Sequence, residues 1–166
     1  AKVDAVVTIG EGKNVTLDLD EYTLTPSEIC SSGKVLKNYG TLNIKGNADG
    51  AIDVTSKGTT WYAIENRGQL NIISGIVKGC YQAIKSVVSG GEVKISGGEI
   101  SSTEIYSGMD GAVYAYMGTV EISGNAKITG ANTAVQIVGG SLTISDNAVL
   151  SGRFGVTLFN DAQKNT

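Results

Sequence analysis

The chain contains no histidine, and this absence removes a large part of catalytic and metal chemistry. Triads that use histidine as the base and metal sites built on imidazole are both excluded. Positive charge is also scarce, because 13 lysines and arginines face 16 aspartates and glutamates, for a net charge of −3. We see no basic patch of the kind that phosphate contacts require, so we expect no nucleic-acid partner. No apolar run reaches the roughly 18 residues of a membrane span.

Proline is rare and glycine is abundant. The single proline, Pro26, stands against 23 glycines. Glycine in this quantity is costly unless tight turns need it. The stretches between the glycines are rich in Val, Ile and Thr, which favour strands. The composition therefore indicates an all-β protein with many turns, and 166 residues fit a single domain, 1–166, with a real core.

A short motif recurs along the chain, with the pattern Gly, any residue, Leu or Val, any residue, Ile. Five copies are GTLNIKG (40–46), GQLNIIS (68–74), GEVKISG (91–97), GTVEISG (118–124) and GSLTISD (140–146). Their leading glycines are 28, 23, 27 and 22 residues apart. A looser sixth copy, NVTLDLD (14–20), has Leu17 and Leu19 in the paired apolar positions. Six copies at this spacing predict a solenoid.

Two further apolar stretches accompany the motif. One precedes the glycine, as in AIENRG (63–68), and one follows the motif, as in AIDV (51–54). Apolar residues alternate within each stretch, which is strand periodicity. Three short strands per repeat predict a parallel β-helix of about six coils, stacked about 4.8 Å apart. Leucine-rich repeats share the period but need a Leu-rich signature and usually a helical segment, so they are a weaker alternative, and a β-propeller or sandwich is a third.

The repeats align into columns that we expect to face inward. One column is Leu17, Leu42, Leu70, Val93, Val120, Leu142; the next is Leu19, Ile44, Ile72, Ile95, Ile122, Ile144; a third contains Ile64, Ile84, Val113, Val135. Asn38 and Asn66 share one place before their glycines, which predicts a stacked pair of amides at a turn. The glycines of GGEVKISGGEI (90–100) mark corners, since a phosphate loop would need a following helix.

The segment VTIGEGKNVTLDLDEYTLT (7–25), followed by GTLNIKG and GGEVKISGGEI, resembles the right-handed parallel β-helix repeats of bacterial adhesin-like surface proteins. Related coils occur in phage tailspikes and fibres and in pectate-lyase-like enzymes. The resemblance implies a right-handed helix in which residues 1–25 form an N-terminal capping segment and the first coil. It departs from the family at DLDE (18–21), where such repeats commonly have a turn-forming Asn-Gly. One fold hosts many activities, so the resemblance is specific for fold and not for function.

The expected outward positions give little support for catalysis. The column between the paired apolar positions is Asp18, Asn43, Asn71, Lys94, Glu121, Thr143. Glycoside hydrolysis needs two carboxyl groups at a set separation, and no two neighbouring coils supply them. Lys94 and Glu121 are expected to form a surface ion pair. The acidic run of Asp18, Asp20 and Glu21 is interpreted as a solvated first coil rather than a calcium site, and we predict no metal and no cofactor.

The two cysteines are expected to be free thiols. Cys30 and Cys80 precede strands that are two coils apart, or roughly 9–10 Å by strand spacing. A disulfide requires Cα atoms within about 7 Å.

Two long excursions, TSKGTTWY (55–62) and SSTEIYSGMDG (101–111), leave the same corner of the predicted coils. Insertions in solenoids gather on one face, which is often the binding face. The candidate ligand site is Trp61, Tyr62, Tyr106 and Asp110, because aromatic rings beside hydroxyl and carboxylate groups suit sugars or a protein partner. The alternative is that these rings only cover the corner of the core.

The sequence thus favours a non-catalytic extracellular module on a bacterial cell surface, a β-helical stalk or a glycan- or receptor-binding element. A phage virion component and a polysaccharide-acting enzyme are the alternatives. The last coil shows no lid, so we expect further chain beyond Thr166 or another subunit, including a second copy, to cover it.

Overall fold

The computed structural model describes residues 1–31, 33–58, 62–87, 90–105 and 111–159. The protein is all-β, and every strand pair in its sheets is parallel. Within the described ranges, the one helical segment is the 3-10 turn η1 (Thr55–Lys57). No helix in these ranges is long and apolar enough to cross a bilayer.

A seven-stranded sheet is built from the stretches that follow the motif, with an N-terminal strand at its edge. Its order is β1 (Lys2–Val3), β4 (Thr23–Pro26), β7 (Ala51–Asp53), β10 (Ile76–Gly79), β13 (Glu99–Ser102), β15 (Lys127–Thr129), β17 (Val149–Ser151). From β4 onward the strands follow chain order, so each one lies beside its counterpart from the next repeat.

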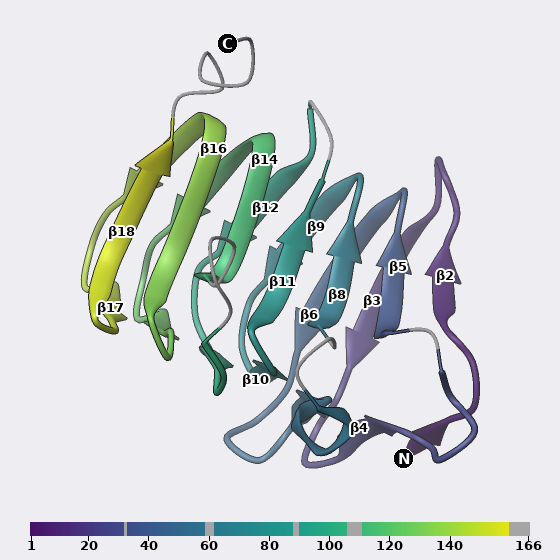
Figure 1. The fold of residues 1–166 in the computed structure, drawn as a ribbon. Helices are drawn as coiled ribbons and strands as arrows, with labels where there is room; N and C mark the ends of the chain where they lie inside the picture. The colour runs from purple at the N-terminus through teal and green to yellow at the C-terminus, as the bar shows by residue number, and fades with distance from the viewer. Residues whose placement is uncertain (32, 59–61, 88–89, 106–110, 160–166) are drawn as a thin grey trace, which may run out of the picture.

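The second sheet has eleven strands and doubles back around the core (Figure 1). Its first arm is β2 (Val7–Ile9), β5 (Lys34–Asn38), β8 (Tyr62–Asn66) and β11 (Gln82–Ser86). Its second arm is β3 (Asn14–Asp18), β6 (Thr41–Lys45), β9 (Gln69–Ile72) and β12 (Glu92–Ile95). The two arms meet at β14 (Gly111–Ile122), and β16 (Thr133–Ile144) and β18 (Phe154–Phe159) continue from it.

The strands β14 and β16 differ from the expected pattern of three short strands per repeat. Each is a single 12-residue strand that spans two of the predicted stretches. The two repeats have corners of equal length, so Tyr116 pairs with Val138 and Gly118 pairs with Gly140 across the bend. The bend itself falls at Met117 and Gly139, whose φ angles are 56° and 59°. Backbone pairing through this corner makes one continuous strand of two stretches that the sequence pattern separates.

The inward columns are confirmed from the second copy to Val120 and Ile122, and Leu142 and Ile144 continue them in register at the end of the stack, where Ile144 is 44% exposed. The first arm stacks Leu36, Ile64, Ile84, Val113 and Val135, and the second arm stacks Leu42, Leu70, Val93 and Val120. The prediction that Leu17 and Leu19 begin the second-arm columns is wrong. Val15 pairs with Leu42, and Leu17 pairs with Ile44. Val15, Leu17 and Leu19 alternate evenly, so two alignments fit the apolar pattern, and strand pairing selects the one shifted by two residues.

The same shift corrects the outward column. Thr16, not Asp18, pairs with Asn43, while Asp18 pairs with Lys45 and forms an ion pair of 2.7 Å with it. From Asn43 onward, the predicted outward positions pair in the expected order.

The motif glycines lie where successive repeats approach most closely. A Cβ atom at Gly68 would overlap the carbonyl oxygen of Gly40, and one at Gly140 would overlap that of Gly118. In the stretch 90–100, Gly90 and Gly98 have φ angles of 87° and 81° and flank β12. The prediction that these glycines mark corners is confirmed.

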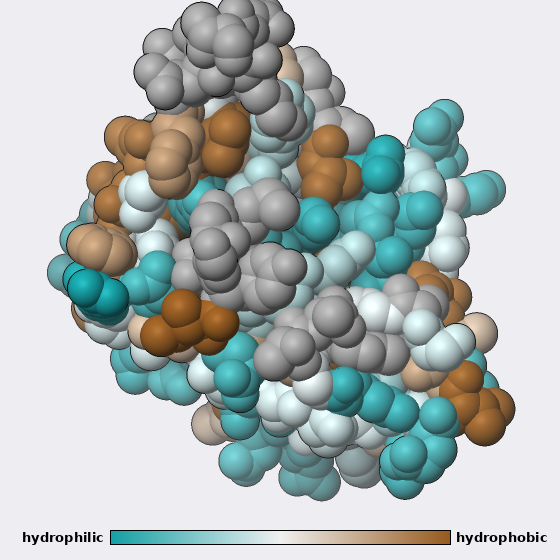
Figure 2. Space-filling view, viewed as in Figure 1, coloured by the Kyte–Doolittle hydropathy of each residue, from teal (hydrophilic) through white to brown (hydrophobic). Residues whose placement is uncertain are grey.

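Apolar residues are exposed at both ends of the stack. Residues 2–3 and 7–9, within the expected capping segment, form β1 and β2 at the sheet edges. Val7 and Val15 there are 45% and 39% exposed and line a hollow of about 330 Å³. At the other end Leu158 is 68% exposed. Figure 2 shows hydrophobic residues gathered over the β18 end of the molecule.

Candidate functional site

Three of the four residues predicted to bind ligand, Trp61, Tyr106 and Asp110, lie outside the described residues. The fourth, Tyr62, is the first residue of β8 and is half-buried. The chain passes from the seven-stranded sheet to the first arm between β4 and β5, between β7 and β8, and between β13 and β14. The side chains that surround Tyr62 define the site.

Glu65, on β8, is the centre of this site. Its side chain is 8% exposed, and its Oε2 atom lies 3.1 Å from Lys34 Nζ and accepts a 3.1 Å hydrogen bond from the Tyr62 hydroxyl. Its Oε1 atom accepts a 2.8 Å hydrogen bond from Arg67 Nε and lies 3.8 Å from Lys37 Nζ. Both carboxylate oxygens are therefore held by donors from two strands, β5 and β8, and from the corner that follows β8.

The strand geometry explains how Tyr62 reaches Glu65. Perfect alternation would place residues three apart on opposite faces of a strand. The pairing of β8 with β5 joins Lys34 to Tyr62 and Leu36 to Ile64, with no pair between them, and both Ala63 and Ile64 are fully buried. Alternation is thus broken at Ala63, and the Tyr62 side chain comes onto the face of Glu65.

Burial of Glu65 acts to raise the pKa of its carboxyl group. The hydrogen bonds from Arg67, Lys34 and Tyr62, with the positive charge of Lys34, outweigh burial and hold this pKa at about 2. Burial acts to lower the pKa of Lys34, but the hydrogen bond to Glu65 and the further interactions with Tyr62 and Glu65 together outweigh it, and the pKa is raised. Burial, with the charge of Glu65, raises the pKa of Tyr62. At neutral pH the site therefore holds a carboxylate, charged lysine and arginine side chains, and a neutral tyrosine.

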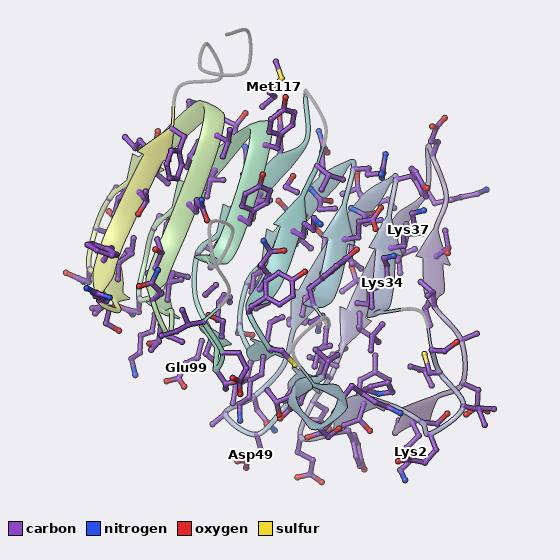
Figure 3. All side chains as sticks on the ribbon, viewed as in Figure 1. Lys2, Lys34, Lys37, Asp49, Glu99 and Met117 are labelled. Atoms are coloured by element: carbon purple, nitrogen blue, oxygen red, sulfur yellow. The ribbon has the colours of Figure 1, made fainter. Side chains whose placement is uncertain are left out.

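Two lysines from the neighbouring strands approach the ring of Tyr62. Lys34 Nζ on β5 lies 5.4 Å from the ring centroid, and Lys85 Nζ on β11 lies 5.1 Å from it. Lys37 Nζ lies 5.0 Å from the centroid of Tyr39. These separations fit cation–π contacts. Figure 3 shows Lys34 and Lys37 on β5, along the first arm. We call Lys34, Lys37, Tyr62, Glu65, Arg67 and Lys85 the Glu65 cluster.

The cluster belongs to a longer line of side chains across the first arm, which we call the outer row. Its members pair in register from strand to strand: Thr8, Lys37, Glu65, Lys85, Tyr114, Gln136, Thr157. Successive members are therefore separated by roughly 4.8 Å, the strand spacing. Tyr114 and Gln136 are 6% and 3% exposed, and burial raises the pKa of Tyr114. The outer row thus changes from charged at β5–β11 to uncharged at β14–β18.

The remaining sequence candidates have structural roles. Lys94 and Glu121 form the predicted ion pair, at 3.5 Å, with both side chains about half exposed. Asp20 adopts a positive φ of 47°, its backbone amide bonds to Asp18, and its carboxylate accepts a hydrogen bond from Asn47, as expected of a turn. Within the described ranges no group of three acidic, cysteine or histidine side chains is placed to hold a metal ion.

Cys30 and Cys80 are buried and are not joined in a disulfide, which confirms the prediction. Cys80 Sγ lies 3.5 Å from the carbonyl oxygen of Val54.

Sequence reasoning did not select Glu65, Lys34, Lys37, Arg67 or Lys85. The signal for three of them was present, because Lys37, Glu65 and Lys85 occupy the same place in VLKNYG (35–40), AIENRG (63–68) and AIKSVV (83–88). Reading that position as an outward column would have aligned two cations around a carboxylate. The contribution of Lys34 depends on the broken alternation and has no such signal.

Comparison with protein-family models, with curated proteins and with solved structures finds no match to this chain.

Proposed function

We propose that this chain is a right-handed parallel β-helix of about six coils that serves as a non-catalytic extracellular module. In this proposal it forms a stalk or adhesive element of a bacterial cell surface, and the Glu65 cluster, in the charged part of the outer row, is the face that binds a glycan or receptor. The repeat spacing and the parallel pairing of each strand with its counterpart in the next repeat support the fold. The motif resemblance in residues 7–25 supports the location.

The observation that carries the binding face is the charged part of the outer row. Lys37, Glu65 and Lys85 lie on adjacent parallel strands, the two lysines are partly exposed, and Tyr39 and Tyr62 are each within reach of a lysine. Sugars are bound by aromatic rings together with polar groups, and rigid strands fix such groups before the ligand arrives.

The non-catalytic part of the proposal rests on the carboxylates. General acid–base catalysis is most effective when the pKa of the catalytic group lies near the working pH. The pKa of Glu65 is about 2 and its two oxygens already accept hydrogen bonds, so it is a poor proton donor and a poor base at neutral pH. The neighbouring outward pair on the second arm, Lys94 and Glu121, is a cation with a carboxylate rather than two carboxylates.

Binding of the purified chain to an immobilised panel of bacterial and host glycans tests this function. We expect binding without turnover of the bound sugar. Tyr39→Ala removes a half-buried ring beside Lys37, and Tyr22→Ala is the matched control, because Tyr22 is 64% exposed in the turn between β3 and β4. Tyr39→Ala should weaken binding and Tyr22→Ala should not. Release of shortened sugar, or equal binding by both variants, would contradict the proposal.

A further inference from the structure

The Glu65 cluster contains more positive charge than its carboxylate can neutralise. Among the described residues of the cluster, Lys34, Lys37, Arg67 and Lys85 supply four cations and Glu65 supplies one anion, an excess of three positive charges. This excess occurs on a chain whose net charge is −3. Like charges held together on one face repel one another, so the arrangement is costly unless an anion joins it.

Lys85 shows the imbalance most clearly. It is half-buried on β11, between Glu65 of β8 and Tyr114 of β14 in the outer row. Its ammonium group lies 5.1 Å from the Tyr62 ring, and within the described part of the chain no carboxylate lies within ion-pairing distance of it. By contrast, exposed lysines elsewhere on the sheets have such partners, as in the pairs Lys94–Glu121 and Lys127–Glu99.

Lys37 and Arg67 also retain capacity to bind an anion. Lys37 Nζ stands 3.8 Å from Glu65, which is too long for a good hydrogen bond, and its side chain is 30% exposed. Arg67 uses Nε for Glu65, and a guanidinium group has four further N–H donors on its terminal nitrogens. The Arg67 side chain is 38% exposed, so a ligand can reach it. These donors flank the rings of Tyr39 and Tyr62.

We propose that the Glu65 cluster binds an acidic glycan, with Lys37, Lys85 and Arg67 contacting its carboxylate or sulfate groups and the tyrosine rings contacting its sugar faces. This inference rests on the proposed function and names its ligand class. Lys37 and Lys85 lie two strands apart in the outer row, or roughly 9–10 Å, so they suit a polymer with repeated negative charges. A nucleic acid fits less well, because specific binding of that kind usually engages more phosphates than three or four cations can contact.

Titration calorimetry of the purified chain tests this with four probes: heparin as a sulfated glycan, polygalacturonate as a carboxylated one, dextran as a neutral one and oligothymidylate as a nucleic acid. We expect binding to heparin or polygalacturonate that weakens steeply with added salt, and no binding to dextran. The double variant Lys37→Gln/Lys85→Gln should bind the acidic glycan roughly a hundredfold more weakly, at about tenfold for each charged contact.

The matched control is Lys94→Gln/Lys127→Gln, which removes the same charge from exposed ion pairs elsewhere. It should reduce affinity far less than the cluster variant, and both variants should keep the wild-type circular dichroism spectrum. Equal losses from both double variants would overturn the proposal, and so would tighter binding to oligothymidylate than to either acidic glycan. Salt-independent binding to dextran would contradict the proposal of an acidic ligand but would remain consistent with a glycan-binding module. Absence of binding to any glycan, including those on the panel, would overturn both.

Discussion

The Nδ2 atom of Asn38 donates a 2.8 Å hydrogen bond to Oδ1 of Asn66, across two adjacent repeats, and both side chains are fully buried. The pair confirms the stacked amides that the sequence predicts. Asn38 also donates to the carbonyl of Gln69, and Asn66 donates to the carbonyls of Gly68 and Glu92. The two amides therefore connect the corners of three successive repeats from inside the sheet.

Substitution of Asn66 should be costly for this reason. Asn66→Leu removes donors from the carbonyls of Gly68 and Glu92 and should lower the free energy of unfolding by about 2–3 kcal/mol. Asn71→Leu is the control, because Asn71 belongs to an outward ladder in which it donates a 2.8 Å hydrogen bond to Asn43 and remains partly exposed. It should cost less than about 1 kcal/mol. Urea denaturation measures both, and equal losses would contradict an inward role for Asn66.

A charge in the core should be far more damaging than one on the surface next to it. Ile95 is 1% exposed and pairs with Ile72 and Ile122. Ile95→Asp places an unpaired carboxylate in this aliphatic column, and we expect a loss of about 4 kcal/mol or more, enough to unfold a marginally stable domain. Lys94→Asp, one residue away, loses the surface pair with Glu121 and should cost about 1 kcal/mol or less. Similar melting temperatures for the two variants would refute this register.

Glu65 should make the protein sensitive to acid. Its pKa is about 2 in the folded chain, against an ordinary value of 4.5. A lowered pKa stabilises the fold at pH values above the ordinary one, and the stabilisation is lost as the pH falls toward the folded value. The shift corresponds to at most about 3 kcal/mol, lost progressively between about pH 5 and pH 2.

The variant Glu65→Gln should lose most of that pH dependence and be less stable than the wild type at pH 7. Glu99→Gln is the control, because Glu99 forms an exposed ion pair with Lys127. Unfolding curves recorded across this pH range measure the effect. A wild-type stability that stays constant from pH 5 to pH 2 would show that the contacts of Glu65 do not lower its pKa.

The close approach of repeats at the motif glycines predicts a sharp difference between two glycines. Gly68→Ala would force a Cβ against the backbone carbonyl of Gly40, and we expect a loss of about 3 kcal/mol. At Gly155, in β18, nothing lies within 4 Å of an added Cβ, so Gly155→Ala should leave stability unchanged or slightly raised. Thermal unfolding of both variants checks the prediction, and a tolerated alanine at Gly68 would show that the corners can separate.

The exposed apolar residues at the β18 end should promote association. Leu158 continues the inward column of Ala115 and Ile137 and yet is 68% exposed. We expect light scattering to show association that increases with concentration and is reduced by Leu158→Glu. Ile29→Glu, at a residue 75% exposed between β4 and β5, adds the same charge away from that end and should have little effect. A wild-type chain that stays monomeric at high concentration would disprove this.

Much of the fold could be predicted from the sequence because equivalent positions in successive repeats occupy the same place in the structure. A column such as Ile72, Ile95 and Ile122 is visible once the copies are aligned, and strand pairing confirms it residue by residue. The alignment failed only in the first copy, where three evenly alternating apolar residues fit two registers equally well. The apolar pattern does not separate registers that differ by two residues, because the inward and outward faces stay the same.

The sequence by itself determined an all-β chain, the repeat, its parallel columns, the corner glycines, the buried amide pair and the lack of a Cys30–Cys80 disulfide, since each follows from composition, from a position repeated between copies or from the spacing of the strands. Only the tertiary structure decided the continuous strands β14 and β16, the register of the first copy and the Glu65 cluster. Those features depend on how neighbouring backbones pair and on where alternation breaks, as at Ala63, where a local bend brings Tyr62 to Glu65. Side chains of the Glu65 cluster come from strands that are separate in the sequence, and the apolar pattern of any one strand does not predict their contacts.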